Sequence, residues 1–307
     1  MKKNSNWEVV SRKQINDKAW NDCVGASVTP MIYALTHYLD AIHPGWKGLV
    51  QEGEKGYDAV MPLTIRKCLT IPFLLQPLFA QQLGVFSKKE KKIDTFHLLK
   101  EMFPYINYQG NAYEDIISLS PAISWRTNIV KQLSSSADVM TGYNQNRKRD
   151  IKKALKAGLT ISETHDSGLI INFFKATKGK EINAFKPKHY NRLQKLVETL
   201  QAYDQVHLSC VYDAKGLLVS GGIFTHFKNR ITFLFGTSGA EGRKCGAMTF
   251  LLHEMIKKYT KSCHTFDFEG SDIEGLKKYY LSFGGGLEHY PLYYSNQLPW
   301  PLNMIIR

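Results

Sequence analysis

Three strand-like segments, separated only by short turns, dominate the second half of this chain. They are rich in β-branched and aromatic residues and cover Val206–Tyr212, Leu217–Phe224 and Ile231–Phe235. Turn residues lie between them at 213–216 and 229–230. A glycine-rich loop follows at 236–246, and residues 247–259 then carry one apolar stripe at helical spacing. This order predicts an antiparallel meander that leads through a loop into a helix.

Other periodic segments surround the meander. Before it we expect a strand at 159–163 and a helix at about 188–203, and after it a strand at 264–268, a helix at 273–282 and a last strand through Tyr294. The first half predicts a strand at 7–10, helices at 31–42 and 95–103, and a hairpin of 57–63 with 68–74. We therefore predict an α/β (α+β) chain of two similar domains, 1–140 and 141–307. Each is a mixed, mostly antiparallel sheet flanked by helices.

The composition limits the classes of function. With 307 residues and 43% hydrophobic content, the chain can build real cores. Its net charge of +13 attracts phosphates, nucleic acid or anionic lipid, while a basic protein without such a partner is the alternative. Five cysteines without a CxxC pair, no signal peptide and no apolar run of 18 residues indicate a cytoplasmic protein without a transmembrane segment. The ten histidines show no HExxH spacing, so we expect no metal site.

The densest basic segment lies at 143–156 and reads YNQNRKRDIKKALK. On a helix, four of its cations share one face, while Ile151 and Leu155 share the other. Such cations repel one another unless an anion lies against them, so a phosphate or polyanion site is one interpretation. A solvated linker helix docked by its two aliphatic residues is the other. The candidate substrate-binding residues here are Tyr143, Arg147, Arg149, Lys152 and Lys153.

The glycine-rich loop supplies small residues just before a helix, where backbone N–H groups can face an anion. It is not a P-loop, because no Gly-Lys-Ser/Thr ends it. Arg243-Lys244-Cys245-Gly246-Ala247 matches half of the Arg/Gln-x-x-Gly-x-Gly/Ala pattern that holds the pyrophosphate of coenzyme A in acetyltransferases. Met248 stands where the final small residue of that pattern belongs. The candidate donor-binding residues are Phe235, Ser238, Arg243 and Gly246.

Residues 264–272, HTFDFEGSD, alternate aromatic and acidic side chains up to a glycine. The alternation predicts a strand with Asp267 and Glu269 on one face, and Ser271 or Asp272 can cap the next helix. One of these acids could remove the proton of an amine, and Tyr280 could protonate a leaving group. The alternative is that the acids cap the helix and pair with the basic segment.

Three segments, 143–158, 235–247 and 266–284, carry a family resemblance. They contain Lys148-Arg149 with Lys152-Lys153-Ala154, Phe235-Gly236 with Gly246-Ala247, and Phe266-Asp267-Phe268-Glu269-Gly270-Ser271 with Phe283-Gly284. Together they resemble the Fem branch of the GNAT acyltransferases, double-GNAT peptidyltransferases of peptidoglycan cross-bridge synthesis with bacterial relatives. The resemblance covers about 140–295 well and the first half only by layout. It implies two GNAT-like halves and an acceptor groove near the second.

The resemblance also implies an activity. Characterised Fem enzymes transfer from an aminoacyl-tRNA to a lipid- or nucleotide-linked muropeptide, and Arg149 matches the arginine that meets the acceptor's phosphates. Their late helix carries a Phe-Lys pair whose lysine is important for transfer, where this chain has Tyr279-Tyr280. We therefore expect an N-acyltransferase without a permanently bound cofactor that uses acyl-CoA or aminoacyl-tRNA as donor. Its acceptor would be an amine linked to phosphate, such as a cell-wall precursor. The alternative is a catalytically inactive GNAT-fold protein that binds RNA or a phosphorylated ligand, and the basic surface also allows peripheral membrane contact.

Overall fold

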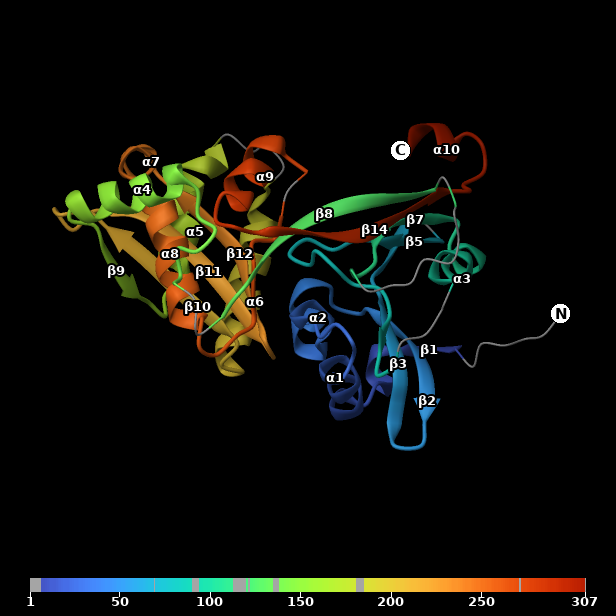
Figure 1. The fold of residues 1–307 in the computed structure, drawn as a ribbon. Helices are drawn as coiled ribbons and strands as arrows, with labels where there is room; N and C mark the ends of the chain where they lie inside the picture. The colour runs from blue at the N-terminus through green and yellow to red at the C-terminus, as the bar shows by residue number, and fades with distance from the viewer. Residues whose placement is uncertain are drawn as a thin grey trace. The chain divides into compact units, whose positions relative to one another are not determined.

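The computed structural model describes residues 7–68, 70–89, 94–112, 120, 122–134, 138–180, 185–270 and 272–306 (Figure 1). The chain divides into two compact units, residues 1–126 with 289–307, and residues 127–288. Strands and helices alternate in both units, and most neighbouring strands are antiparallel. The predicted fold class is therefore confirmed.

The first unit holds two groups of strands. One is antiparallel, in the order β1 (Trp7–Ser11), β2 (Lys47–Gly53), β3 (Gly56–Leu63) and β6 (Phe86–Ser87). The other contains β4 (Ile65–Cys68), β5 (Ile71–Leu75), β7 (Tyr105–Gln109) and the end of β14 (Gly286–Asn296), with β5 and β7 parallel. The helices are α1 (Asp17–Gly25), α2 (Thr36–Ile42), α3 (Thr95–Met102) and α10 (Leu302–Ile305), with 3-10 turns at Arg12–Gln14 and Ile32–Ala34.

The second unit is built on strands in the order β8-β13-β12-β11-β10-β9. They are β8 (Ile123–Gln132), β9 (Thr160–Glu163), β10 (Val206–Tyr212), β11 (Leu218–Phe227), β12 (Arg230–Ser238) and β13 (Thr265–Asp267). Neighbours are antiparallel except β12 with β13, which are parallel. The helices are α4 (Gln145–Lys156), α5 (Ser167–Ala176), α6 (Pro187–Ala202), α7 (Ala240–Cys245), α8 (Ala247–Tyr259) and α9 (Glu274–Leu281), with a 3-10 turn at Lys178–Lys180.

Helices cover both faces of this second sheet. A Cβ atom added at Gly221 of β11 would lie 3.1 Å from Ile170 of α5, whereas one added at Gly222 would lie 3.1 Å from Leu251 of α8. Successive residues of a strand face opposite sides. The helices α5 and α8 therefore lie on opposite faces of β11.

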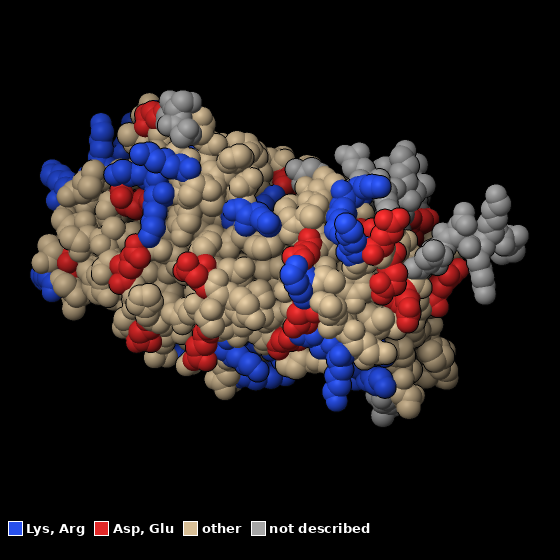
Figure 2. Space-filling view, turned by 90° about the horizontal axis from the view of Figure 1, so that it is seen from below, with Lys and Arg blue, Asp and Glu red and all other residues tan. Residues whose placement is uncertain are grey.

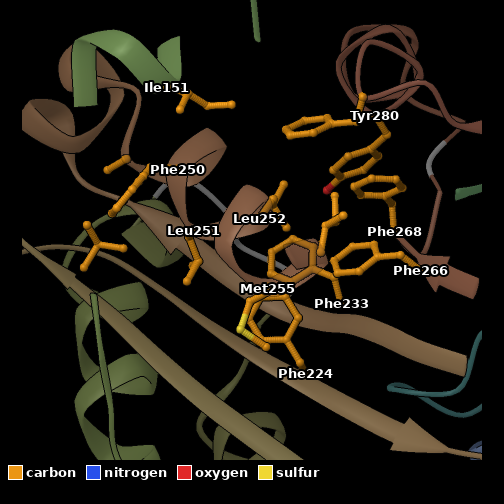
Figure 3. Packing of buried hydrophobic residues seen from close by; sticks show 14 of the residues in the cluster. Ile151, Phe224, Phe233, Phe250, Leu251, Leu252, Met255, Phe266, Phe268 and Tyr280 are labelled. Atoms are coloured by element: carbon orange, nitrogen blue, oxygen red, sulfur yellow. The ribbon is translucent and has the colours of Figure 1, made fainter. Parts of the chain in front are cut away.

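The apolar core on the α8 side explains why the second unit is compact. Figure 3 shows Leu251, Leu252 and Met255 of α8 beside the rings of Phe224 and Phe233. These α8 side chains are at most 1% exposed, as the predicted apolar stripe requires. Burying a side chain of this size stabilises the fold by about 1.5–3 kcal/mol. The core thus fixes α8, and with it the loop that precedes α8.

The structure corrects several expectations. The hairpin expected between 57–63 and 68–74 does not form. Strand β3 (57–63) pairs with β2 and β6 instead. Strand β5 pairs with β4, which is its nearer neighbour in sequence. The helix expected at 31–42 is interrupted, since Leu35 is extended (φ −66°, ψ 142°) between a 3-10 turn and α2.

The two units also do not follow the domain boundary drawn from the sequence between residues 140 and 141. Val139, Met140 and Tyr143 all pack on the core of the second unit, so the chain enters that unit earlier. The last residues return to the first unit, because Leu292–Asn296 of β14 pair with β7.

Candidate functional site

A cavity of about 720 Å³ opens in the second unit beside the end of β12. Its volume lies within the range of about 300–1,000 Å³ typical of small-molecule sites. Three cations and one acid are among the described residues that line it, so the cavity favours an anion. The lining residues come from α4, the 3-10 turn, β12, the α7–α8 region and α9: Arg147, Asp150, Lys178, Gly236, Thr237, Ser238, Gly242, Arg243, Gly246, Met248, Thr249, Leu276 and Tyr279.

The strand β12 parts from β13 before it reaches the cavity. The two strands pair from Arg230 with Thr265 to Thr232 with Asp267, while β12 continues to Ser238. The register against β11 shifts by one residue in between, which makes Leu234 the extra residue of a β-bulge. Residues 236–238 therefore reach the cavity beyond the last pairing with β13.

Two amides of β12 point toward this free side of the strand. Gly239 N donates to Val219 O at 3.0 Å, and hydrogen-bonded and non-bonded pairs alternate along antiparallel strands. Gly236 and Ser238 therefore direct their N–H and C=O groups away from β11. The direction is confirmed at Ser238, whose carbonyl accepts a hydrogen bond from Arg243 Nη1 at 2.8 Å. Amides placed in this way can stabilise negative charge on a ligand oxygen.

Arg147 is held from several sides at the α4 wall of the cavity. Its Nη2 pairs with Asp150 Oδ2 at 2.9 Å, and its Nη1 donates to Thr249 Oγ1 at 3.0 Å. The guanidinium also lies over the ring of Tyr279, 4.5 Å from the centroid. Its Nε is buried and has no hydrogen-bond partner within the described ranges. A buried donor without an acceptor costs about 1–3 kcal/mol, which offsets part of what the bonds of Nη1 and Nη2 contribute.

Gly246 joins α7 to α8 at the point where the loop touches α4. Its φ of +75° lies in the left-handed region, where glycine is favoured. A Cβ atom at this position would lie 2.9 Å from the backbone oxygen of Asp150. Gly246 and Arg243 both line the cavity. The close contact of Gly246 with the backbone of α4 therefore sets the width of the cavity beside Arg243.

Two neighbouring tyrosines of α9 occupy different environments. Tyr279 lines the cavity with its hydroxyl 3.1 Å from Thr249 Oγ1, and burial raises the pKa of its phenol. Tyr280, the predicted proton donor, is 9% exposed and stacks on Phe268 at a centroid distance of 5.1 Å (Figure 3). Successive helical residues point about 100° apart, and it is Tyr279 that faces the cavity.

The predicted acid Asp267 lies at the other end of β12, fully buried. Arg230 Nη1 donates to its Oδ2 at 2.5 Å, and Arg230 Nη2 donates to Glu288 Oε1 at 2.9 Å. Burial opposes the charge on Arg230, but the two carboxylates outweigh this effect and raise its pKa. The partner of Asp267 is therefore Arg230 and not the basic segment.

Glu269 does not share a face with Asp267. The strand β13 ends at Asp267, and Glu269 has a φ of +48°, so the alternation breaks before it. Neither acid is among the described residues that line the cavity. The helix α9 starts after Ile273 without a side-chain cap, and Ser271 lies outside the described residues.

The remaining predicted residues are spread over three places. Tyr143 is buried and packs edge-on against Phe283, with centroids 5.2 Å apart. Phe235 packs on Phe174 of α5 at a centroid distance of 4.5 Å. Ile151 is buried as predicted, but Ala154 accompanies it and Leu155 is 60% exposed. The cations on the exposed face of α4 include Arg149, Lys152 and Lys153.

Sequence reasoning missed five of the polar lining residues, Asp150, Lys178, Thr237, Thr249 and Tyr279. Asp150 had a signal, because it is the one acid within α4 and lies three residues after Arg147. Thr249 is a polar residue at the edge of the apolar stripe of α8, which is a weaker signal. Lys178 follows α5, a helix that the sequence reasoning did not propose.

Neither a membrane-spanning helix nor a group of metal ligands occurs among the described residues. No helix there combines the length and the apolar content needed to cross a bilayer. No set of three His, Cys, Asp or Glu side chains is grouped there as metal ligands.

Comparisons with known proteins bear on both the site and the fold. Residues 143–290 match the family model described as an acetyltransferase (GNAT) domain. No curated protein matches the chain by sequence. The crystal structure of FemX is similar over 97% of this chain and 99% of that chain, with a TM-score of 0.69 and 14% sequence identity.

Two other solved structures show the same architecture. A tandem GNAT protein from the clavulanic acid biosynthesis pathway matches over 94% of this chain and 97% of that chain, with a TM-score of 0.55 and 10% identity. The C-terminal domain of a putative lysylphosphatidylglycerol synthetase from Agrobacterium fabrum matches over 94% of each chain, with a TM-score of 0.54 and 13% identity. Residues 143–290 therefore match a GNAT acetyltransferase domain, and the chain as a whole shares the two-domain fold of FemX and of the tandem GNAT protein.

Proposed function

We propose that this protein is an N-acyltransferase that moves an acyl group from a coenzyme A thioester to an amine on a phosphate-linked acceptor. The single observation that carries the proposal is the open end of β12. There the strand has left β13, two backbone amides point to its free side, and a cavity with three cations begins. A thioester carbonyl and the phosphates of its carrier are the groups that such a surface recognises.

The donor would lie along β12 with its carbonyl near the amides of Gly236 and Ser238. Arg243, at the corner formed by Gly246, would meet the diphosphate of the carrier. The guanidinium of Arg147 adds a second cation on the α4 wall. Most of the catalytic effect would then come from holding the carbonyl against the amine and from stabilising the oxyanion.

The reaction itself forms one bond and breaks one. The amine nitrogen attacks the carbonyl carbon, a C–N bond forms, the C–S bond breaks, and the carrier leaves as a thiol. Tyr279 is the residue we propose to protonate the leaving sulfur, because its raised pKa keeps the phenol protonated at neutral pH. The amine proton passes to Asp150, directly or through water, since Asp150 is the one acid among the described lining residues.

A cytoplasmic location belongs to the same proposal. All five cysteines are free thiols, which suits a reducing compartment. The acceptor class, an amine carried on a phosphate-linked molecule such as a cell-wall precursor, is likewise a proposal that rests on the basic character of the site.

The test compares two adjacent tyrosines in the purified full-length protein. Acetyl-CoA is offered with a panel of amines, and the released thiol and the acylated product are measured. Tyr279→Phe should lower kcat by about 10²-fold, the usual size of a general-acid effect, with little change in donor KM. Tyr280→Phe should keep the wild-type rate, because that ring packs in the core.

Three outcomes would contradict the proposal in different ways. Equal rates for Tyr279→Phe and the wild type would remove the assigned acid. Transfer from aminoacyl-tRNA but not from acetyl-CoA would show that the donor is wrong. Tight RNA binding without transfer to any amine would favour the catalytically inactive polyanion-binding protein.

A further inference from the structure

The solvent face of α4 carries a group of cations that the described structure leaves unpaired. None of Lys148, Arg149, Lys152, Lys153 and Lys156 forms an ion pair with a described residue. The one acid of the helix, Asp150, faces inward, where it binds Arg147 at 2.9 Å and Thr249 at 3.2 Å. At about 100° per residue, the five cations fall within one arc of the helix, opposite buried Ile151 and Ala154.

Leu155 lies at the edge of this arc and is 60% exposed. It follows Lys152 by three residues, so the two side chains are neighbours on the helix surface. Just beyond α4, a Cβ atom added at Gly158 would lie 3.4 Å from Ala214, in the turn between β10 and β11. That turn exposes a second leucine, Leu217, at 61%. Two exposed leucines therefore accompany the cations at this end of the unit.

We propose that α4 and the turn at 213–217 form a docking surface for an anionic phospholipid bilayer. The lysines and Arg149 would meet the phosphates of the headgroups. Leu155 and Leu217 would enter the boundary between headgroups and acyl chains. A basic helix face edged by exposed apolar side chains is the composition of an interfacial helix.

A bilayer fits this surface better than RNA does. Proteins that hold RNA by its backbone combine cations with aromatic side chains on which bases stack. The sequence of α4 contains no aromatic residue, and the nearby Tyr143 is buried. Exposed leucines gain from an acyl layer and gain nothing from a phosphate backbone. The face seen in Figure 2 mixes Lys and Arg with Asp and Glu, so the net charge of the chain does not by itself make every surface a polyanion site.

Docking through this face has a consequence for the cavity. The inner side of the same helix carries Arg147 and Asp150, which line the cavity. A bilayer held against the outer side would keep the α4 wall at the level of lipid headgroups. The docking surface does not depend on the proposed transfer reaction, and it can be tested without any substrate.

The experiment is co-sedimentation of the full-length protein with sucrose-loaded vesicles. Vesicles of phosphatidylcholine with 30% phosphatidylglycerol are compared with pure phosphatidylcholine at about 0.1 M salt, where the Debye length is about 10 Å. The wild type should bind the anionic vesicles at least tenfold more tightly, and 0.5 M salt should remove most of this preference. The double variant Lys152→Glu/Lys153→Glu should bind at least about 20-fold more weakly, because each cation near an anionic surface contributes about fivefold.

Two further variants make the result specific. Leu155→Ser keeps every charge and should weaken binding by about tenfold, the value of one buried leucine side chain. Lys188→Glu/Lys195→Glu changes the net charge equally on exposed positions of α6 and should bind like the wild type. Circular dichroism shows whether each variant is folded.

The opposite results would overturn the proposal. These are equal binding to both vesicle types, equal loss in the α6 control, or no effect of Leu155→Ser on vesicle binding. Binding of single-stranded RNA that is lost in Lys152→Glu/Lys153→Glu but kept in Leu155→Ser, with no vesicle binding, would assign the surface to RNA.

Discussion

The charged side chains at the two ends of β12 lie in opposite environments. At its start, Arg230 is enclosed with Asp267 and Glu288, and its guanidinium donates hydrogen bonds of 2.5–3.3 Å to these two carboxylates. At its end, Arg243 and Arg147 line an open cavity, and the Nε of Arg147 finds no acceptor within the described residues. We call the first set, Arg230 with Asp267 and Glu288, the closed end of β12. We call the second set, Arg243 and Arg147 at the cavity, the open end.

These two environments indicate different roles for the charged residues. A buried charge whose partners lie within the chain is a structural element, because removing a partner leaves an uncompensated charge. A charge that lines an open cavity can bind a ligand. The acidic motif, which is conspicuous in the sequence, belongs to the closed end. The site belongs to the open end.

The largest effect is expected for Asp267→Ala. It leaves Arg230 buried with Glu288 alone, and breaking a buried pair costs about 3–5 kcal/mol of unfolding free energy. The exposed pair of Lys244 with Glu241 serves as the control, because Glu241→Ala should cost less than about 1 kcal/mol. If Asp267→Ala kept its stability and lost only transfer activity, Asp267 would be catalytic after all.

The position of the tryptophans decides how this stability is measured. All five lie in the first unit, at Trp7, Trp20, Trp46, Trp125 and Trp300. Fluorescence therefore follows the first unit, and hydrogen exchange of the amides in β10–β12 follows the second. The expected loss of protection in Asp267→Ala is in the second.

A second closed group, around His207, predicts how stability depends on pH. Burial and the nearby Lys258 lower the pKa of His207 to about 4. Its Nε2 lies 2.7 Å from Ser209 Oγ and its Nδ1 3.1 Å from Lys258 Nζ, which also donates to Glu163 at 2.5 Å. Between pH 6.5 and 4 the unfolded chain binds a proton at this position and the folded chain does not. Stability should therefore fall by about 2–3 kcal/mol as the pH falls through this window.

The fall in stability between pH 6.5 and pH 4 is tested with His207→Gln, and His264→Gln is the control. His207→Gln should flatten the decline, although Glu163 adds a loss of the same sign because its hydrogen bond with Lys258 lowers its pKa. His264 is exposed in the same unit, so His264→Gln should keep the wild-type slope. A wild-type stability that is constant from pH 7 to pH 4 would contradict the closed, neutral state of His207.

A smaller effect on stability is expected from alanine variants of two glycines, which separate backbone strain from steric contact near the cavity. Gly246 (φ +75°) and Gly216 (φ +77°) have the same left-handed conformation, but a Cβ atom would meet the Asp150 oxygen at 2.9 Å in the first case and no atom within 4 Å in the second. Both alanine variants lose about 1 kcal/mol from strain, and Gly246→Ala should lose about 1–2 kcal/mol more. If the two variants lost the same unfolding free energy in urea, the contact between Gly246 and α4 would not be tight.

The parts of the fold that the sequence predicted are those with strong local patterns. The strand at Val206–Tyr212 and the helix at Ala247–Tyr259 lie where predicted, since their periodicity and turns leave little choice. The pairing of β3 with β2 and β6 was not predictable in the same way, because long-range pairing is decided by tertiary contacts. Helix α5 was missed because its residues 169–174 are nearly all apolar and show no amphipathic stripe.

The site was predicted only where a motif fixes the backbone. Ser238, Arg243 and Gly246 were found because the glycine-rich loop must follow the meander. The choice between Tyr279 and Tyr280 depended on the rotation of α9, and the end of β13 before Glu269 depended on a backbone turn. Neither the rotation of a helix nor such a backbone turn can be predicted from a single sequence. Arg149 and its neighbours were assigned to substrate binding, whereas their place on the exposed face of α4 suits a surface role.

The most direct test of the open end of β12 as the donor site is calorimetric titration with acetyl-CoA. Arg243→Ala removes a cation that lines the cavity, while Lys244→Ala removes its exposed neighbour, which pairs with Glu241 at 2.8 Å. We expect the wild type and Lys244→Ala to bind with equal affinity and Arg243→Ala to bind at least tenfold more weakly, since a charge-assisted hydrogen bond contributes about 1.5–3 kcal/mol. Equal affinity in all three proteins, or no binding by the wild type, would contradict the assignment of this cavity to the donor.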